Sequence, residues 1–72
     1  MNAPLLKGLM VSNGDTQEKL AEFLGISLSR FNAKLNERDG AAFTQPEITA
    51  MVERYHMNSE TAMAVFFTPK SI

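Results

Sequence analysis

The stretch from residue 16 to residue 36 constrains the fold most, because it holds two helix-like patterns that lie only three residues apart. Two helices joined by so short a turn cross at a steep angle, and the first needs a small side chain, here Ala21, where the second approaches. Gly25 can adopt the positive φ of a tight turn without a Cβ penalty, and Ser27 is a good N-cap for the second helix. The sequence therefore predicts a tightly turned pair of short helices.

Three further helices are predicted around this pair, and strand-like alternation occurs nowhere in the sequence. The first is expected near residues 3 to 13, before Gly14, and the helix of about 16 to 24 is capped by Asp15 or Thr16. Thr44-Gln45-Pro46-Glu47 reads as a capping box that opens the fourth helix. Asn58 or Ser59 caps the fifth, which must end before Pro69.

These five helices are expected to form one all-α domain spanning residues 1–72, since a chain of 72 residues has no room for a second core. Polar connections are expected at 13–15, 37–42 and 56–58. The predicted core consists of Leu6, Leu9, Leu20, Ala21, Leu24, Ile26, Phe31, Leu35, Phe43, Ile48 and Val52.

The composition and the absence of certain motifs argue against several classes of function. The chain has no cysteine, which excludes disulfides and thiolate metal sites, and no apolar run approaches the roughly 18 residues that span a bilayer. We therefore expect a cytoplasmic protein that neither enters a membrane nor is exported. Phosphate-binding glycine loops, His-Glu-x-x-His and a supported Ser, His and Asp set are missing, so we expect no enzyme, cofactor or metal. The single histidine, His56, is expected to meet the last carbonyls of the fourth helix.

The charge balance is nearly even, with 7 basic and 8 acidic residues and a net charge of −1. Coating nucleic acid without regard to sequence needs many phosphate-facing cations, so this balance argues against that activity. The segment from Ser27 to Arg38 nevertheless carries three basic residues against one acidic residue. One helix-sized stretch is therefore basic within a slightly acidic protein.

The special residues of the central pair form the pattern Gln17-Glu18-x-x-Ala21-x-x-x-Gly25-Ile26-Ser27-x-x-x-Phe31, followed by Asn32-x-Lys34-Leu35-Asn36. This pattern resembles the helix-turn-helix of phage repressors and Cro proteins, and the resemblance covers nearly the whole chain. It implies a compact five-helix, lambda-repressor-like bundle with the helix-turn-helix at helices 2 and 3. It also implies a sequence-specific transcriptional regulator of phage or prophage, which would bind double-stranded DNA in the cytoplasm of a bacterial host.

The resemblance also assigns roles to residues. Base reading falls to Leu28, Ser29, Asn32 and Ala33, and contacts with the DNA backbone fall to Thr16, Gln17, Arg30, Lys34, Asn36 and Arg38. The chemistry fits, because asparagine can bridge N6 and N7 of adenine, and Leu28 or Ala33 can touch a thymine methyl. Family members often have Gln or Arg where Leu28 stands.

An apolar fifth helix predicts a homodimer. Met63, Phe66 and Phe67 offer more apolar surface than so small a monomer should leave in water. A twofold dimer would place its two third helices about 34 Å apart, which matches successive major grooves and a near-palindromic operator. The other phenylalanines, Phe23, Phe31 and Phe43, are expected in the core or in subunit contacts.

Two other interpretations remain open at this stage. The chain could keep the same fold but bind another phage regulator, as an antirepressor or modulator of repression does, and its acidic total and Leu28 favour that. The segment from 16 to 36 could also be a plain helical hairpin with no nucleic-acid role.

Overall fold

The structure, a computed structural model, describes residues 1–67, and every predicted helix is present within them. Helix α1 (Ala3–Ser12) begins at Asn2, whose side-chain oxygen accepts a hydrogen bond from the Leu5 amide at 3.0 Å. The helix ends before Gly14, which has a φ of 73° as the predicted stop requires. The expected helix near residues 3 to 13 is therefore confirmed.

Helices α2 (Gln17–Leu24) and α3 (Leu28–Leu35) follow and are joined by only three residues. After α3 the chain makes a short 3₁₀ turn, η1 (Arg38–Gly40), inside the segment expected to be a polar loop. Glu37 and Asp39 both have positive φ there, at 51° and 53°. Neither residue type by itself predicts a positive φ at its position. Local composition alone could not predict this turn.

Helix α4 (Gln45–Arg54) begins with the predicted capping box. The Glu47 amide donates to the Thr44 hydroxyl oxygen at 3.3 Å, and the Thr44 amide donates to Glu47 Oε1 at 2.8 Å. Helix α5 (Ser59–Phe66) is capped by Asn58, whose side chain accepts from the Thr61 amide. Pro69, expected to limit this helix, lies outside the described residues.

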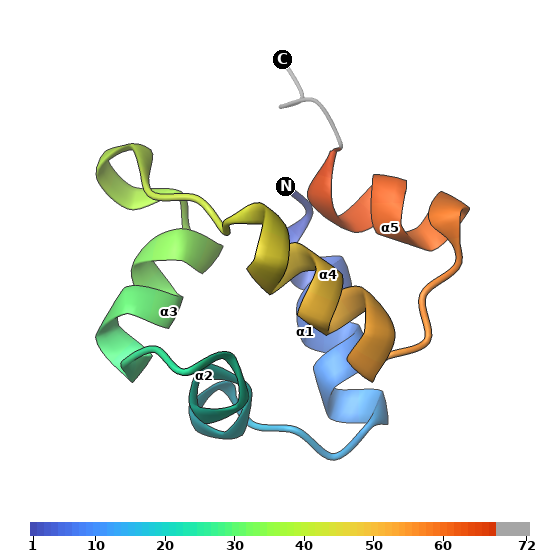
Figure 1. Ribbon diagram of the computed structural model, residues 1–72, viewed down its shortest axis with the longest axis horizontal. Helices are drawn as coiled ribbons and strands as arrows, with labels where there is room; N and C mark the ends of the chain where they lie inside the picture. The colour runs from blue at the N-terminus through green and yellow to red at the C-terminus, as the bar shows by residue number, and fades with distance from the viewer. Residues whose placement is uncertain (68–72) are drawn as a thin grey trace.

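In the view of Figure 1, α4 lies between α3 on one side and α5 on the other. Helix α2 packs on α3, and α1 packs on α5. The N-terminal segment is fastened to α5, because the Asn2 amide donates to the Val65 carbonyl at 2.7 Å. The Cα radius of gyration of 11.4 Å is close to that of other folded chains of this length.

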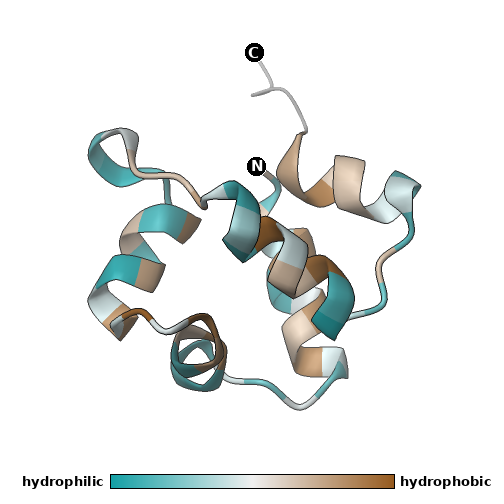
Figure 2. Cartoon of the chain, in the orientation of Figure 1, coloured by the Kyte–Doolittle hydropathy of each residue, from teal (hydrophilic) through white to brown (hydrophobic). Residues whose placement is uncertain are grey.

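The core contains much of what the apolar spacing predicted. Leu6, Leu20, Ala21, Phe31, Leu35 and Phe43 are buried, whereas Leu9, Leu24, Ile26, Ile48 and Val52 are only half-buried. Met10, Met51, Tyr55 and Val65 complete the buried cluster and were absent from the predicted core. Hydropathy colouring shows α5 as largely apolar and α3 as carrying strongly hydrophilic positions (Figure 2). Among the described helices, none is long and apolar enough to cross a bilayer.

Candidate nucleic-acid interface

The turn between α2 and α3 is built as the sequence predicts. Gly25 adopts the left-handed conformation with a φ of 74°, and its amide donates to the Glu22 carbonyl at 3.0 Å. The next amide, that of Ile26, reaches back to the Ala21 carbonyl at 3.0 Å. These bonds satisfy carbonyls at the end of α2 and turn the chain sharply toward α3.

Both helices of the pair are capped by local side chains. Thr16, and not Asp15, caps α2, with its hydroxyl accepting from the Lys19 amide at 3.1 Å. The Ser27 hydroxyl accepts from the Arg30 amide at 3.1 Å, so α3 starts at Leu28 as expected. Caps of this kind fix where each helix begins and therefore which side chains lie on its outer face.

Ala21 is buried in α2, and α2 packs on α3; both observations are consistent with the steric argument from the sequence. Phe31 and Leu35 are buried on the inner side of α3, and Phe31 packs against Phe43 with ring centroids 5.6 Å apart. The inner side of α3 is thereby committed to the core, which leaves its opposite side available for a ligand.

The four predicted base-reading residues lie along the outer part of α3. Ser29 is exposed and stands opposite the buried side of the helix, with Leu28 and Arg30 flanking it. Leu28 is 43% exposed, whereas Asn32 and Ala33 are half-buried. The structure therefore brings this set together on one stretch of helix surface.

Two asparagines of this surface are already hydrogen-bonded to the helix backbone. Asn32 donates its side-chain amide to the Leu28 carbonyl at 3.1 Å, and Asn36 donates to the Asn32 carbonyl at 2.9 Å. A bidentate contact of Asn32 with adenine needs both ends of the carboxamide to face the base. That contact uses Oδ1 and one N–H, so the second N–H of Asn32 can keep its hydrogen bond to the Leu28 carbonyl.

Among the residues predicted to contact the DNA backbone, Lys34 is the one that is buried in the structure. Lys34 is only 6% exposed, and its ammonium group donates to both carboxylate oxygens of Glu47 at 2.7 and 2.9 Å. In this structure Lys34 is therefore not free to meet a phosphate, because breaking the pair would leave the mostly buried Glu47 carboxylate without its counter-ion. The spacing of Lys34 along α3 gave no signal of this partner, which belongs to α4.

The pKa of Glu47 reflects the same pair. Burial acts to raise the pKa of this carboxyl, but the hydrogen bonds from Lys34 and Thr44, together with the Lys34 charge, lower it overall. Glu47 is therefore ionised at neutral pH, and it serves α4 as a capping residue and α3 as a counter-ion.

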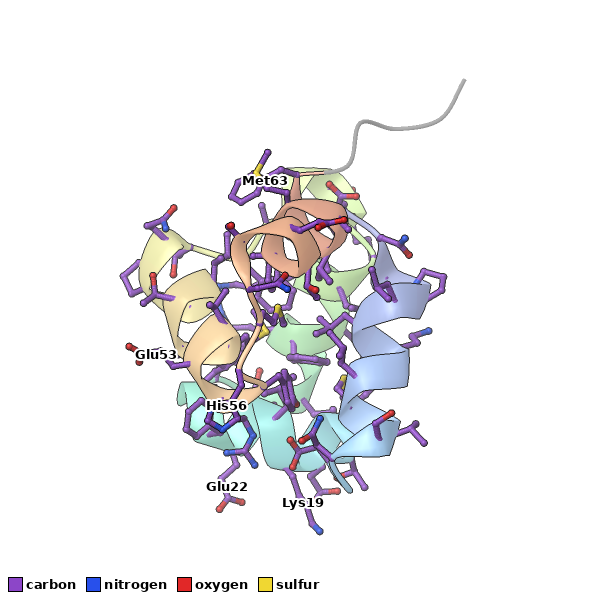
Figure 3. The ribbon with its side chains drawn as sticks, turned by 90° about the vertical axis from the view of Figure 1, so that its right-hand side faces the viewer. Lys19, Glu22, Glu53, His56 and Met63 are labelled. Atoms are coloured by element: carbon purple, nitrogen blue, oxygen red, sulfur yellow. The ribbon has the colours of Figure 1, made fainter. Side chains whose placement is uncertain are left out.

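The other residues predicted to contact the DNA backbone differ in how far they are exposed. Thr16, Arg30, Asn36 and Arg38 are exposed, and Gln17 is half-buried at the start of α2. Exposed acidic residues lie near them: Asp39 follows Arg38, and Glu22 points away from the body of the molecule beside Lys19 (Figure 3). With Lys34 paired internally, this face is less basic than the sequence count suggested.

A second polar cluster fixes the entry to α2. Arg54 of α4 donates through Nε and Nη2 to the two carboxylate oxygens of Asp15, both at 2.8 Å. Tyr55 donates its hydroxyl to Asp15 at 2.7 Å. The Arg54 hydrogen bond, helped by that of Tyr55, lowers the pKa of Asp15 to about 2, against the opposing effect of burial.

Arg54 also lies over the ring of Phe23, 4.4 Å from its centroid. Phe23 is 48% exposed and so does not lie in the core, the first of the two places expected for it; its ring lies beneath the guanidinium group at the surface. The sequence offered no sign of these contacts, because Arg54 lies 39 positions after Asp15 and 31 positions after Phe23.

The predicted dimer residues of α5 differ in exposure. Met63 is 59% exposed and points away from the bundle (Figure 3), and Phe67 is also exposed. Phe66 is half-buried and packs against the core, so much of its apolar surface is already covered within the monomer. His56 is exposed at a φ of 51° after α4.

No group of three potential metal-ligating side chains comes together within residues 1–67. Comparison of the chain with protein-family models, with curated proteins and with solved structures finds no match.

Proposed function

We propose that this chain is a sequence-specific DNA-binding regulator in which α2 and α3 act as a helix-turn-helix and α3 enters the major groove. The observation that carries the proposal is the tightly turned pair, with Gly25 left-handed, Ala21 buried in the first helix and Ser29 exposed on the second. A groove-binding helix needs this combination, because one side must be fixed to the domain while the other remains free for base edges.

The proposed contacts follow from exposure. Ser29, Leu28 and Asn32 would meet base edges, with half-buried Ala33 beside them. Arg30 and Arg38 would meet phosphates, together with Thr16, Gln17 and Asn36. Lys34 has no part in the interface, since its charge is committed to Glu47. Such a protein carries out no covalent chemistry and acts by occupying an operator.

We further propose that the functional unit is a homodimer formed through α5. The exposed Met63 and Phe67 support this, because two copies meeting there would remove both side chains from water. A twofold dimer calls for a near-palindromic operator with half-sites one helical turn apart.

The test begins with selection of bound fragments from a random DNA pool, followed by anisotropy measurements on the preferred site and on random DNA. Asn32→Ala should weaken binding to the preferred site by about 1 to 3 kcal/mol and leave binding to random DNA nearly unchanged. Arg38→Ala, as the matched phosphate variant, should weaken both alike and flatten the logarithmic salt slope by about one. Equal losses on both DNAs from Asn32→Ala would contradict base reading by α3.

A second candidate function is a protein-interaction module that binds another regulator. The internal pairing of Lys34 with Glu47 favours it, because this leaves Arg30 as the exposed cation of α3. Saturable binding to one DNA sequence by the protein alone supports the first candidate, whereas binding only in the presence of a partner protein supports the second.

A further inference from the structure

Part of the hydrogen-bonding capacity of the outer side of α3 is used within the protein. Asn32 and Asn36 each donate one side-chain N–H to a backbone carbonyl of α3, and Lys34 is buried in its ion pair. Ser29 contributes one hydroxyl. Each asparagine keeps a second N–H and its oxygen for a base edge, and an apolar contact beside them would add to what these groups can distinguish.

At the edge of this side, α3 presents an apolar group at a fixed position. Leu28 is the first residue of the helix and stands directly after the Ser27 cap, so its backbone is held by the hydrogen bond from the Arg30 amide. Its side chain is 43% exposed and does not belong to the core cluster. Residues in the first turn of a groove-binding helix are the ones that approach base edges most closely.

The major groove offers one apolar group for such a side chain, the C5 methyl of thymine. We propose that Leu28 reads thymine by burying this methyl group, so that the protein prefers a methyl-bearing pyrimidine at that step. The inference rests on the proposed function, and it names the chemical feature that the recognition helix detects. Arg30, on the other flank of Ser29, is placed to hold a phosphate without influencing that choice.

Deoxyuridine substitution tests the inference, because uracil keeps every hydrogen-bonding group of thymine and lacks only the methyl. Each thymine of a selected operator is replaced in turn, and affinity is measured by anisotropy with the full chain. We expect a loss of about three- to fivefold at one or two positions in each half-site, as the burial of one methyl group predicts. Replacing a cytosine by 5-methylcytosine in an operator that carries cytosine at the sensitive position should recover a similar factor.

The variant Leu28→Ala should bind the thymine and deoxyuridine operators with equal affinity, with the salt slope of the parent retained. Val11→Ala is the matched control, since Val11 is an exposed aliphatic residue on α1, 77% exposed and away from the pair. This control should keep the full preference for thymine. Thermal unfolding of both variants should match the parent within about 0.5 kcal/mol, as is usual for exposed positions.

Three results would overturn the inference, and they are distinguishable. Specific binding with no position sensitive to deoxyuridine would refute methyl reading and leave the proposed function standing. A thymine preference that survives in Leu28→Ala would assign the methyl contact to another residue. Absence of saturable DNA binding by the parent protein would refute the proposed function itself.

Discussion

At the scale of single residues, Asp15 shows how one carboxylate can hold distant parts of a small protein together. It accepts hydrogen bonds from Arg54 and Tyr55 and its side chain is 7% exposed. Arg54 in turn covers Phe23 on α2. Asp15 therefore ties the segment before α2 to the end of α4, and the position of Thr16 at the start of the proposed interface depends on it.

Asp15→Asn should destabilise the protein by about 1 to 3 kcal/mol at pH 7, because hydrogen bonds to a charged partner lose their ionic character. The pKa of Asp15 is lowered to about 2 in the folded protein, below its unfolded value of 3.8, so its stabilisation is complete above about pH 5. It is lost as the pH falls toward 2. Urea unfolding of parent and variant across this range should show the difference in unfolding free energy shrinking toward low pH.

Asp39→Asn is the control for that experiment, since Asp39 is exposed and asparagine tolerates its left-handed conformation. It should unfold like the parent at every pH. A parent–Asp15→Asn difference that does not change between pH 5 and pH 2 would show that Asp15 contributes through its shape and not through its charge.

At the scale of helices, the first member of the central pair contains a small, buried side chain. Ala21 is buried in α2, and its carbonyl accepts the Ile26 amide that closes the turn. The ion pair between Lys34 and Glu47 then fixes α3 against the start of α4. The orientation of α3 is thus set at both of its ends, by a steric contact and by an ion pair.

Ala21→Leu should force α2 and α3 apart and destabilise the protein by about 1 to 3 kcal/mol, the usual cost of overpacking. For a domain of this size, each kcal/mol lowers the Tm by about 4 to 8 °C. Calorimetry on the variant measures the effect. Ala42→Leu makes the same chemical change at an exposed position and should leave the Tm almost unchanged; a similar Tm for both variants and the parent would place the crossing elsewhere.

At the scale of the whole molecule, α5 contributes both to the core and to the surface. Val65 and Phe66 face the rest of the bundle, and Met63 and Phe67 face solvent. A substitution at Phe66 would therefore disturb the monomer as well as any dimer. Met63 is the better probe of association, because its side chain is largely free of internal contacts.

Met63→Gln should weaken homodimerisation by about tenfold while the monomer stays folded, since each copy loses the burial of one apolar side chain. Sedimentation velocity over a range of concentrations, with and without operator DNA, measures the monomer–dimer equilibrium. Val11→Thr is the control for a similar apolar-to-polar change on α1 and should not alter the equilibrium. A monomeric parent at high concentration and with DNA present would contradict the proposed dimer.

The sequence by itself determined which segments are helical and where four of the helices begin. Thr16, Ser27, Thr44 and Asn58 cap helices where the pattern placed them, and Gly25 takes the left-handed turn. These features were predictable because a cap or a turn joins groups within four residues of each other, so the local sequence contains both partners. The all-α class follows from the same local signals.

Only the tertiary structure decided which polar residues are paired and which remain free to bind. Lys34 was indistinguishable from Arg30 in the sequence, and yet α4 supplies a carboxylate to one and not to the other. Arg54 of α4 likewise contacts Asp15 and Phe23, and the sequence indicated neither contact. The physical reason is that a buried charge requires a counter-charge, and the element that provides it is brought near by packing and not by the order of residues along the chain.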